Sequence, residues 1–350
     1  MSSRLVKFGL PDASAWHFPT LDTPVPSSPF TSEWLSSIFA SSMNVTTPLT
    51  IAIVYFSSVH FINPIVKNRQ LRKYYEKNPS EKKSSKEPKR VPAAPYAIAR
   101  NPLFKVFVLL HNIFLCVYSV WTFIGMTASI VNTMGVFKGD ILPTFYASLN
   151  RDTYTFKKFE LFFQSVCDSK QGVFSRIISN DHHNLEVFGW WFYISKFYEV
   201  IDTIIILLKG RPSSLLQSYH HAGAMMCMWA GIRFQSPPIW IFVVFNSFIH
   251  SLMYFYFSLS CLHIRVPTLF KRVLTSMQIT QFVVGGSIAV LHSFVWIIDT
   301  SEYVSEDNLR LISCISTPDQ ALPVLINVAY LAPLTALFAA FYIESYLKRK

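Results

Sequence analysis

Three ionisable residues stand within one apolar stretch of the sequence, where a lipid-facing helix would carry none. Lys196, Glu199 and Asp202 follow one another at intervals of three residues. In a helix this spacing brings them to one side, and each costs about 2.5–3.5 kcal/mol near the membrane centre. The stretch therefore predicts either a polar cavity with a function or a structural Lys196–Glu199 pair that fixes helix packing.

Two adjacent histidines begin the next apolar stretch. His220 and His221 follow Gln217, and side chains of consecutive residues point about 100° apart on a helix. A neutral imidazole can act as a nucleophile, as a base or as a hydrogen-bond donor to an oxyanion. Histidines next to a stretch that carries Glu and Asp therefore indicate an active site.

Two further stretches each place polar side chains on one helix face. Asn246, His250 and Tyr254 recur every four residues, and Gln278 and Gln281 lie three residues apart. The amide side chains either contact a substrate or join helices through hydrogen bonds.

The elements that position these residues are apolar segments long enough to cross a bilayer. Of the 350 residues, 51% are hydrophobic and 15% are charged. We predict an all-α integral membrane protein with seven transmembrane helices, because each segment can cross about 30 Å of hydrocarbon. The predicted spans are 47–66, 104–128, 187–208, 213–232, 238–261, 271–297 and 321–345.

The distribution of Lys and Arg predicts the orientation of this seven-helix domain, 47–345. Most of them lie in the basic loop 67–103, in the short loops on the same side and in the tail 346–350, which we therefore place in the cytosol. The segment 1–46 and the loop 129–186, with short interfacial helices, then face the lumen. The net charge of +11 is thus mostly a topology signal, which disfavours nucleic-acid binding.

Depth brings the polar residues into one layer. Counted inward from the cytosolic charges at 1.5 Å per residue, the carboxylates, imidazoles and amides lie roughly 10–22 Å deep. The opposite half of the bundle is apolar and aromatic, which suits a long acyl chain. We expect this tunnel to close near Phe294 and Trp296.

Three sequence motifs and a histidine pair resemble the fatty-acid elongase (ELO) family of the endoplasmic reticulum. Residues 196–203 match its KxxExxDT motif, 246–256 match NxxxHxxMYxY, and 275–282 match TxxQxxQF. His111 and Asn112 resemble another family element. The chain is similar to a fungal-like very-long-chain 3-oxoacyl-CoA synthase, but Gln217 replaces the first histidine of the family's HxxHH box, as in elongases that favour polyunsaturated chains.

The resemblance implies a condensation of acyl-CoA with malonyl-CoA that releases CO₂ and CoA, without a metal or another cofactor. It implies membrane lipid as the surroundings, the reductases and dehydratase of the elongation cycle as partners, and a possible homodimer. On this basis His220 is the expected acyl acceptor or base, and Asp202 orients an imidazole. His221 and His250 position the thioester and the malonyl group. Expected substrate-binding residues are Lys196, Glu199, Gln217, Asn246, Tyr254, Gln278 and Gln281.

Two other classes fit the sequence less well. A membrane di-iron desaturase or hydroxylase needs several histidine boxes, and Gln217 interrupts the one candidate box. A seven-helix receptor would not gather histidines with Glu and Asp at one depth, and a transporter would usually show internal repeats.

Two cysteines fall in loops on the predicted lumenal side. Cys167 lies in 129–186 and Cys314 in 298–320, which close the same end of the bundle. An oxidising lumen would maintain a disulfide between them, worth about 2–4 kcal/mol. The alternative is two unpaired thiols in one compartment.

Overall fold

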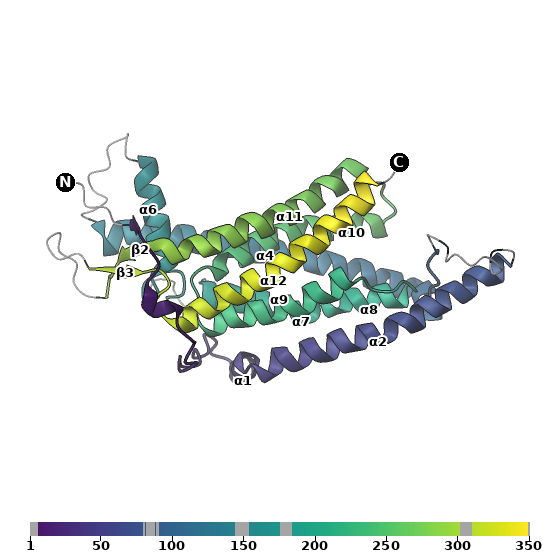
Figure 1. Cartoon of the computed structure of the whole chain (residues 1–350), viewed down its shortest axis with the longest axis horizontal. Helices are drawn as coiled ribbons and strands as arrows, with labels where there is room; N and C mark the ends of the chain where they lie inside the picture. The colour runs from purple at the N-terminus through teal and green to yellow at the C-terminus, as the bar shows by residue number, and fades with distance from the viewer. Residues whose placement is uncertain are drawn as a thin grey trace.

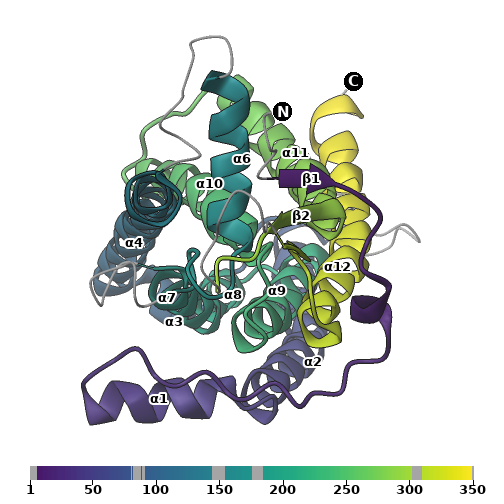
Figure 2. The ribbon, with the colours of Figure 1, turned by 90° about the vertical axis from the view of Figure 1, so that its left-hand side faces the viewer.

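Apolar segments of the chain form long helices that lie side by side, and a small sheet covers one end of them (Figures 1 and 2). This computed structural model describes residues 6–79, 81, 88, 91–143, 154–175, 184–301 and 310–348. We call the end that carries the sheet the sheet end, and the opposite end, which holds Lys77 and Lys209, the open end. The chain starts near the sheet end and finishes at the open end (Figure 1).

Helices make up most of the described chain. The longer ones are α1 (Glu33–Met43), α2 (Thr46–Lys77), α4 (Pro102–Val136), α6 (Tyr154–Cys167), α7 (Leu185–Tyr198), α8 (Val200–Leu208), α9 (Leu215–Arg233), α10 (Ile239–Cys261), α11 (Thr268–Leu291) and α12 (Pro318–Tyr342). Short helical turns are η1 (Ala13–Trp16), α3 (Ala97–Arg100), η3 (Phe137–Ile141), η5 (His292–Phe294) and η6 (Ile343–Leu347). The strands are β1 (Val6–Phe8), β2 (Val295–Ile298) and β3 (Leu311–Ser313).

Each of the seven predicted spans coincides with a helix or, for 187–208, with the pair α7 and α8. Five helices of the described chain are long and apolar enough to cross a membrane: α2, α4, α10, α11 and α12. A helical membrane protein is thus the right class, and seven crossings stay a prediction. The α7–α8 pair and α9 do not meet this requirement of length and apolar composition. The first is divided into two shorter helices at Glu199, and polar residues of the cluster lie in the α7–α8 pair as well as in α9.

The predicted all-α class fits the helical bundle, and the structure adds a short antiparallel sheet of three strands at the sheet end, in the order β1-β2-β3. Val6 pairs with Ile297, and Trp296 pairs with Ser313. The predicted span 271–297 therefore ends too late, since its helix stops at Leu291. A short, continuously apolar run such as 295–298 can be a buried strand as well as a helix end, and periodicity alone cannot separate the two.

The predicted loop 67–103 is also partly helical, because α2 continues to Lys77 beyond its apolar part. Helix α2 is seen at the lower edge of the bundle, and it extends outward at the open end (Figure 1). In the predicted lumenal loop 129–186, α4 and η3 occupy the first part and α6 the second. Parts of the predicted loops 67–103 and 129–186 and of the tail 346–350 lie outside the described residues.

Covalent and polar links hold the sheet end together. Cys167 at the end of α6 and Cys314 after β3 form the disulfide that the sequence predicted, with a Cα–Cα distance of 4.8 Å. The N-terminal segment crosses this end of the bundle (Figure 2). Asp319 accepts hydrogen bonds from the backbone N–H groups of Leu21 and Thr23 at 2.9 and 3.0 Å.

Candidate active site

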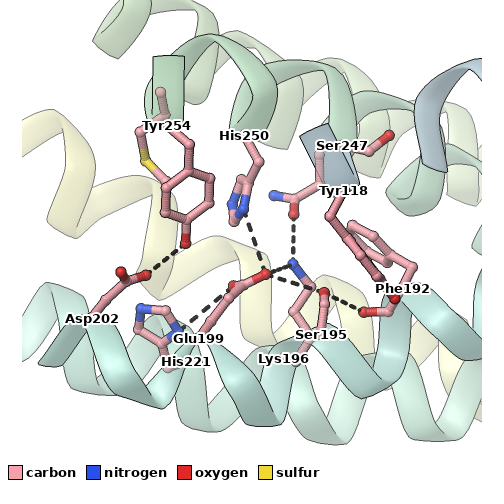
Figure 3. Close-up of polar contacts among 12 residues, drawn as sticks. Tyr118, Phe192, Ser195, Lys196, Glu199, Asp202, His221, Ser247, His250 and Tyr254 are labelled. Atoms are coloured by element: carbon pink, nitrogen blue, oxygen red, sulfur yellow. Dashed lines mark hydrogen bonds and ion pairs between the residues drawn. The ribbon is translucent and has the colours of Figure 1, made fainter. Parts of the chain in front are cut away.

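A buried ion pair lies at the centre of the polar cluster (Figure 3). Lys196 Nζ lies 2.7 Å from Glu199 Oε1, and the two side chains are 2% and 3% exposed. The ammonium also donates to Asn246 Oδ1 at 3.1 Å, and Ser195 Oγ donates to the same carboxylate at 3.2 Å. The predicted Lys196–Glu199 pair is therefore present and joins α7 to α10. Glu199 occupies the one-residue break between α7 and α8.

Two imidazoles face the same carboxylate at distances too long for hydrogen bonds. His221 Nδ1 lies 3.8 Å from Glu199 Oε2, and His250 Nδ1 lies 3.6 Å from Glu199 Oε1. Glu199 Oε2 and both Nδ1 atoms are buried and have no hydrogen-bond partner among the described residues. Unsatisfied buried polar atoms cost about 1–3 kcal/mol each. The cluster can therefore gain by tightening when a ligand enters.

His220 is held from a different helix. Its Nδ1 lies 2.8 Å from the hydroxyl of Tyr330 in α12, and that hydroxyl donates to the backbone oxygen of His220 at 3.0 Å. Because the single phenolic hydrogen is used there, Nδ1 carries the ring hydrogen and Nε2 keeps a lone pair. Gly223 makes room for the phenol, since a Cβ at this position would lie 2.2 Å from the Tyr330 ring.

Asp202 contacts none of the three histidines in the α9–α10 cluster. Its Oδ1 lies 2.8 Å from His111 Nε2, and its Oδ2 accepts from the Tyr254 hydroxyl at 2.6 Å. The imidazole that Asp202 orients is therefore that of His111 in α4. Tyr254 is fully buried. Its hydroxyl donates to Asp202, and Tyr254 lines neither of the two cavities described below.

Two cavities meet at the cluster. The larger has a volume of about 740 Å³, and its wall contains Lys105 and Lys209 toward the open end as well as His220, His221 and His250. The smaller has about 40 Å³ and is mainly apolar, with Phe192, Ile241, Phe245 and Leu331 in its wall. Four residues line both cavities: His220, Asn246, Gln281 and Phe282. His220 thus stands at the junction of a wide cavity, whose wall combines charged, polar and apolar side chains, and a narrow apolar one.

Most of the predicted site residues reach these cavities. The larger cavity is lined by Asp202, Gln217, His220, His221, Asn246, His250, Gln278 and Gln281. Lys196 reaches only the smaller one. Glu199 and Tyr254 line neither cavity. Glu199 lies behind His221 and His250, which face its carboxylate, and Tyr254 lies behind Asp202, to which it donates a hydrogen bond.

The predicted tunnel end is wrong for these two cavities. Phe294 and Trp296 belong to the sheet end, and neither is in the wall of either cavity. Trp296 Nε1 instead donates to the backbone oxygen of Leu10 at 3.0 Å.

Sequence reasoning missed Tyr330 and gave little weight to His111. Tyr330 belongs to an otherwise apolar stretch, and a lone tyrosine there gives no signal. His111 followed by Asn112 in an apolar helix was the available signal. Its partner could not be derived, because that depends on how α4 is rotated toward α8.

Fold and cluster together define a helical membrane protein that gathers imidazoles around a buried carboxylate. The family model described as "ELO: GNS1/SUR4 family" matches residues 40–350, and the chain belongs to this family.

Curated relatives carry elongase names. Fatty acid elongase 2 of Trypanosoma brucei brucei is 30% identical over 166 residues, 46% of this chain and 58% of that protein. Fatty acid elongase sre1 of Dictyostelium discoideum is 34% identical over 138 residues, 38% of this chain and 50% of that protein. Very long chain fatty acid elongase 3 of Homo sapiens is 29% identical over 129 residues, 37% of this chain and 47% of that protein. The chain thus spans about half the length of these relatives. No solved structure matches the chain.

Proposed function

We propose that this protein condenses an acyl-CoA with malonyl-CoA to give a 3-oxoacyl-CoA two carbons longer, CoA and CO₂. Family membership and the elongase names of its relatives support this reaction. The observation that carries the proposal is the position of His220, where the wide cavity that contains the charged and amide side chains meets the narrow apolar pocket. A thioester joins a polar CoA to an apolar chain, so its carbonyl belongs at such a junction.

The two cavities divide the substrate accordingly. The larger one has the size of a typical ligand site, and Lys105 and Lys209 provide positive charge for the phosphates of CoA. The smaller pocket receives the acyl chain. Its volume of about 40 Å³ is too small for a long chain, so Phe245 and Phe282 must move as the chain enters.

The reaction proceeds in two steps on His220. Its Nε2 attacks the thioester carbonyl, the C–S bond breaks, and the CoA thiolate leaves and takes up a proton. Malonyl-CoA then loses CO₂, and the resulting enolate carbon attacks the acyl group and frees the imidazole. One proton is consumed overall, and neighbouring N–H donors stabilise the oxyanions that form. His250, which also lines the larger cavity, is placed to donate or accept a hydrogen bond there.

The remaining polar residues hold this machinery in place. Lys196 neutralises Glu199 and is too deeply buried to reach the phosphates of CoA at the open end. Asp202 fixes His111 and Tyr254, which connects α8 to α4 and α10. Asn246, Gln278 and Gln281 present amides to the larger cavity, where they can bind thioester or malonyl oxygens.

The proposed membrane arrangement has seven crossings, with the sheet end in the lumen of the endoplasmic reticulum and the open end in the cytosol. The α7–α8 pair and α9 would supply the two crossings beyond the five long apolar helices. A disulfide at the sheet end suits an oxidising lumen, and basic residues at the open end suit the cytosol. Reductases and a dehydratase acting on the 3-oxoacyl product would be the functional partners.

A direct test uses membranes that contain the full-length protein, radiolabelled malonyl-CoA and a panel of acyl-CoA substrates. We expect labelled 3-oxoacyl product with at least one long acyl-CoA, and none from the His220→Ala variant at equal expression. Membranes that incorporate no malonyl carbon with any acyl-CoA would contradict the proposed reaction.

A further inference from the structure

The residue that departs from the family's histidine box contacts the second of the paired histidines. Gln217 lies one helical turn before His221, and the Nε2 atoms of the two side chains are 2.8 Å apart. Ser214 caps α9 by accepting the backbone N–H of Gln217 at 3.2 Å, which fixes this first turn. An amide nitrogen donates and does not accept, so His221 Nε2 must present a lone pair.

The other ring nitrogen of His221 meets the same requirement from the opposite side. His221 Nδ1 faces Glu199 Oε2 at 3.8 Å, and both atoms are buried without a hydrogen-bond partner among the described residues. A carboxylate accepts hydrogen bonds only, so it favours the tautomer that carries the ring hydrogen on Nδ1. The amide at Nε2 and the carboxylate that faces Nδ1 therefore favour the same tautomer of His221.

The other two histidines of the cluster are different in this respect. Tyr330 engages Nδ1 of His220, and Glu199 faces Nδ1 of His250 at 3.6 Å. Neither has a protein hydrogen bond at Nε2 in the described chain, and both side chains line the larger cavity. Of these three histidines, His221 is the one whose Nε2 contacts a side chain of the described residues at hydrogen-bond distance.

We propose that Gln217 is a positioning residue that holds His221 as the Nδ1–H tautomer, so that His221 supports Glu199 and leaves the reaction to His220 and His250. This inference rests on the proposed condensing function and replaces the expected role of His221 in binding substrate. A histidine at position 217 could become charged or exchange its donor and acceptor nitrogens, whereas the NH2 group of the Gln217 amide remains an uncharged donor at every pH.

The ionisable groups around His221 come from several helices. They are Lys196 of α7, Glu199 at the junction of α7 and α8, Asp202 of α8, Tyr55 of α2, His220 of α9 and His250 of α10. All of them remain when only position 217 is changed. A pH dependence that is new in a variant therefore reports the introduced group.

The test compares two variants of the full-length protein in detergent, assayed with malonyl-CoA and an accepted acyl-CoA between about pH 6 and about pH 9. In Gln217→Glu the ionised carboxylate can only accept, so it imposes the opposite tautomer, and we expect kcat to fall at least about tenfold at high pH. At low pH the protonated carboxyl donates again, and activity relative to wild type should recover. Gln217→Met removes the donor at every pH, so its smaller loss of kcat should follow the wild-type pH profile, with the KM for acyl-CoA unchanged.

Gln171→Met is the matched control, because it removes one amide hydrogen bond, to the backbone oxygen of Thr300, at the sheet end. It should keep wild-type kcat. Gln217→Glu with a wild-type pH profile would overturn the inference but not the proposed function. If Gln217→Glu does not accumulate, Gln217→Met decides alone, and an unchanged kcat would overturn the inference. A wild-type protein without condensing activity would overturn the function and this inference with it.

Discussion

The sheet end and the histidine cluster are held together by different kinds of contact. At the sheet end, a disulfide, a three-stranded sheet and the bonds of Asp319 to the N-terminal segment join pieces of chain that are far apart in sequence. In the histidine cluster, Glu199 Oε2 and two imidazole nitrogens are buried with no partner in the described structure. The contacts of the first region stabilise the fold, whereas the second region gathers ionisable side chains beside a cavity that can hold a substrate. Substitutions at the two ends should accordingly affect different measured quantities.

The largest effect on turnover is expected at His220. Replacing it with Ala removes the nucleophile and its bond to Tyr330, and we expect condensing activity to fall by about 10³-fold or more. The unfolding midpoint should change little, since the side chain lines both cavities. Steady-state assays and thermal unfolding of the purified variant measure the two quantities. Turnover near that of the wild type would remove His220 from the reaction.

The largest effect on stability is expected at the ion pair. Glu199→Ala leaves the Lys196 ammonium buried without its carboxylate, and such a loss typically costs about 3–5 kcal/mol. The double variant Glu199→Ala, Lys196→Met removes both charges and should be more stable than the single variant. Chemical unfolding in detergent gives the comparison. A single variant as stable as wild type would show that the pair does not hold α7 to the bundle.

A smaller stability effect, with turnover unchanged, is expected at the disulfide. Cys167→Ser with Cys314→Ser opens a loop of 147 residues, and the expected cost is about 2–4 kcal/mol. Because the bridge lies at the sheet end, kcat per folded molecule should equal that of wild type. Free Cys116 provides the control, since Cys116→Ser removes a thiol that lines neither cavity and breaks no bridge. A large fall in kcat at full stability would contradict the separation of the two ends.

The smallest effect concerns product length. Phe245 walls the narrow pocket and Phe294 does not, so Phe245→Ala should lengthen the products by about one condensation cycle of two carbons while Phe294→Ala leaves them unchanged. Chain-length analysis of products from both variants tests this directly. Longer products from Phe294→Ala alone would restore the tunnel end that the sequence predicted.

Helix positions and the polar cluster could be predicted because both have strong signals in the sequence. Apolar runs long enough to cross a bilayer mark the helices, and charged residues within them mark a protein-facing side. The neighbours of each side chain could not be predicted. Asp202 binds His111 and not a histidine of α9 or α10, because helix rotation decides which imidazole lies within reach.

The sheet end shows a second limit. Counting depth along a straight helix from 271 to 297 placed Phe294 and Trp296 at the end of a tunnel, but the helix stops at Leu291 and the chain turns into β2. Val295 to Ile298 pair with β1 and β3, and the first of these strands comes from the opposite end of the sequence. Long-range strand pairing of this kind leaves no local pattern in the sequence.

The central claim is that His220 accepts the acyl chain, and it is tested most directly by incubating the purified full-length protein with an acyl-CoA in the absence of malonyl-CoA. We predict release of about one CoA per protein molecule and an acyl group attached to His220, located by mass spectrometry. His220→Ala should release none. No CoA release from an active wild-type protein, or an acyl group attached to another residue, would contradict the claim.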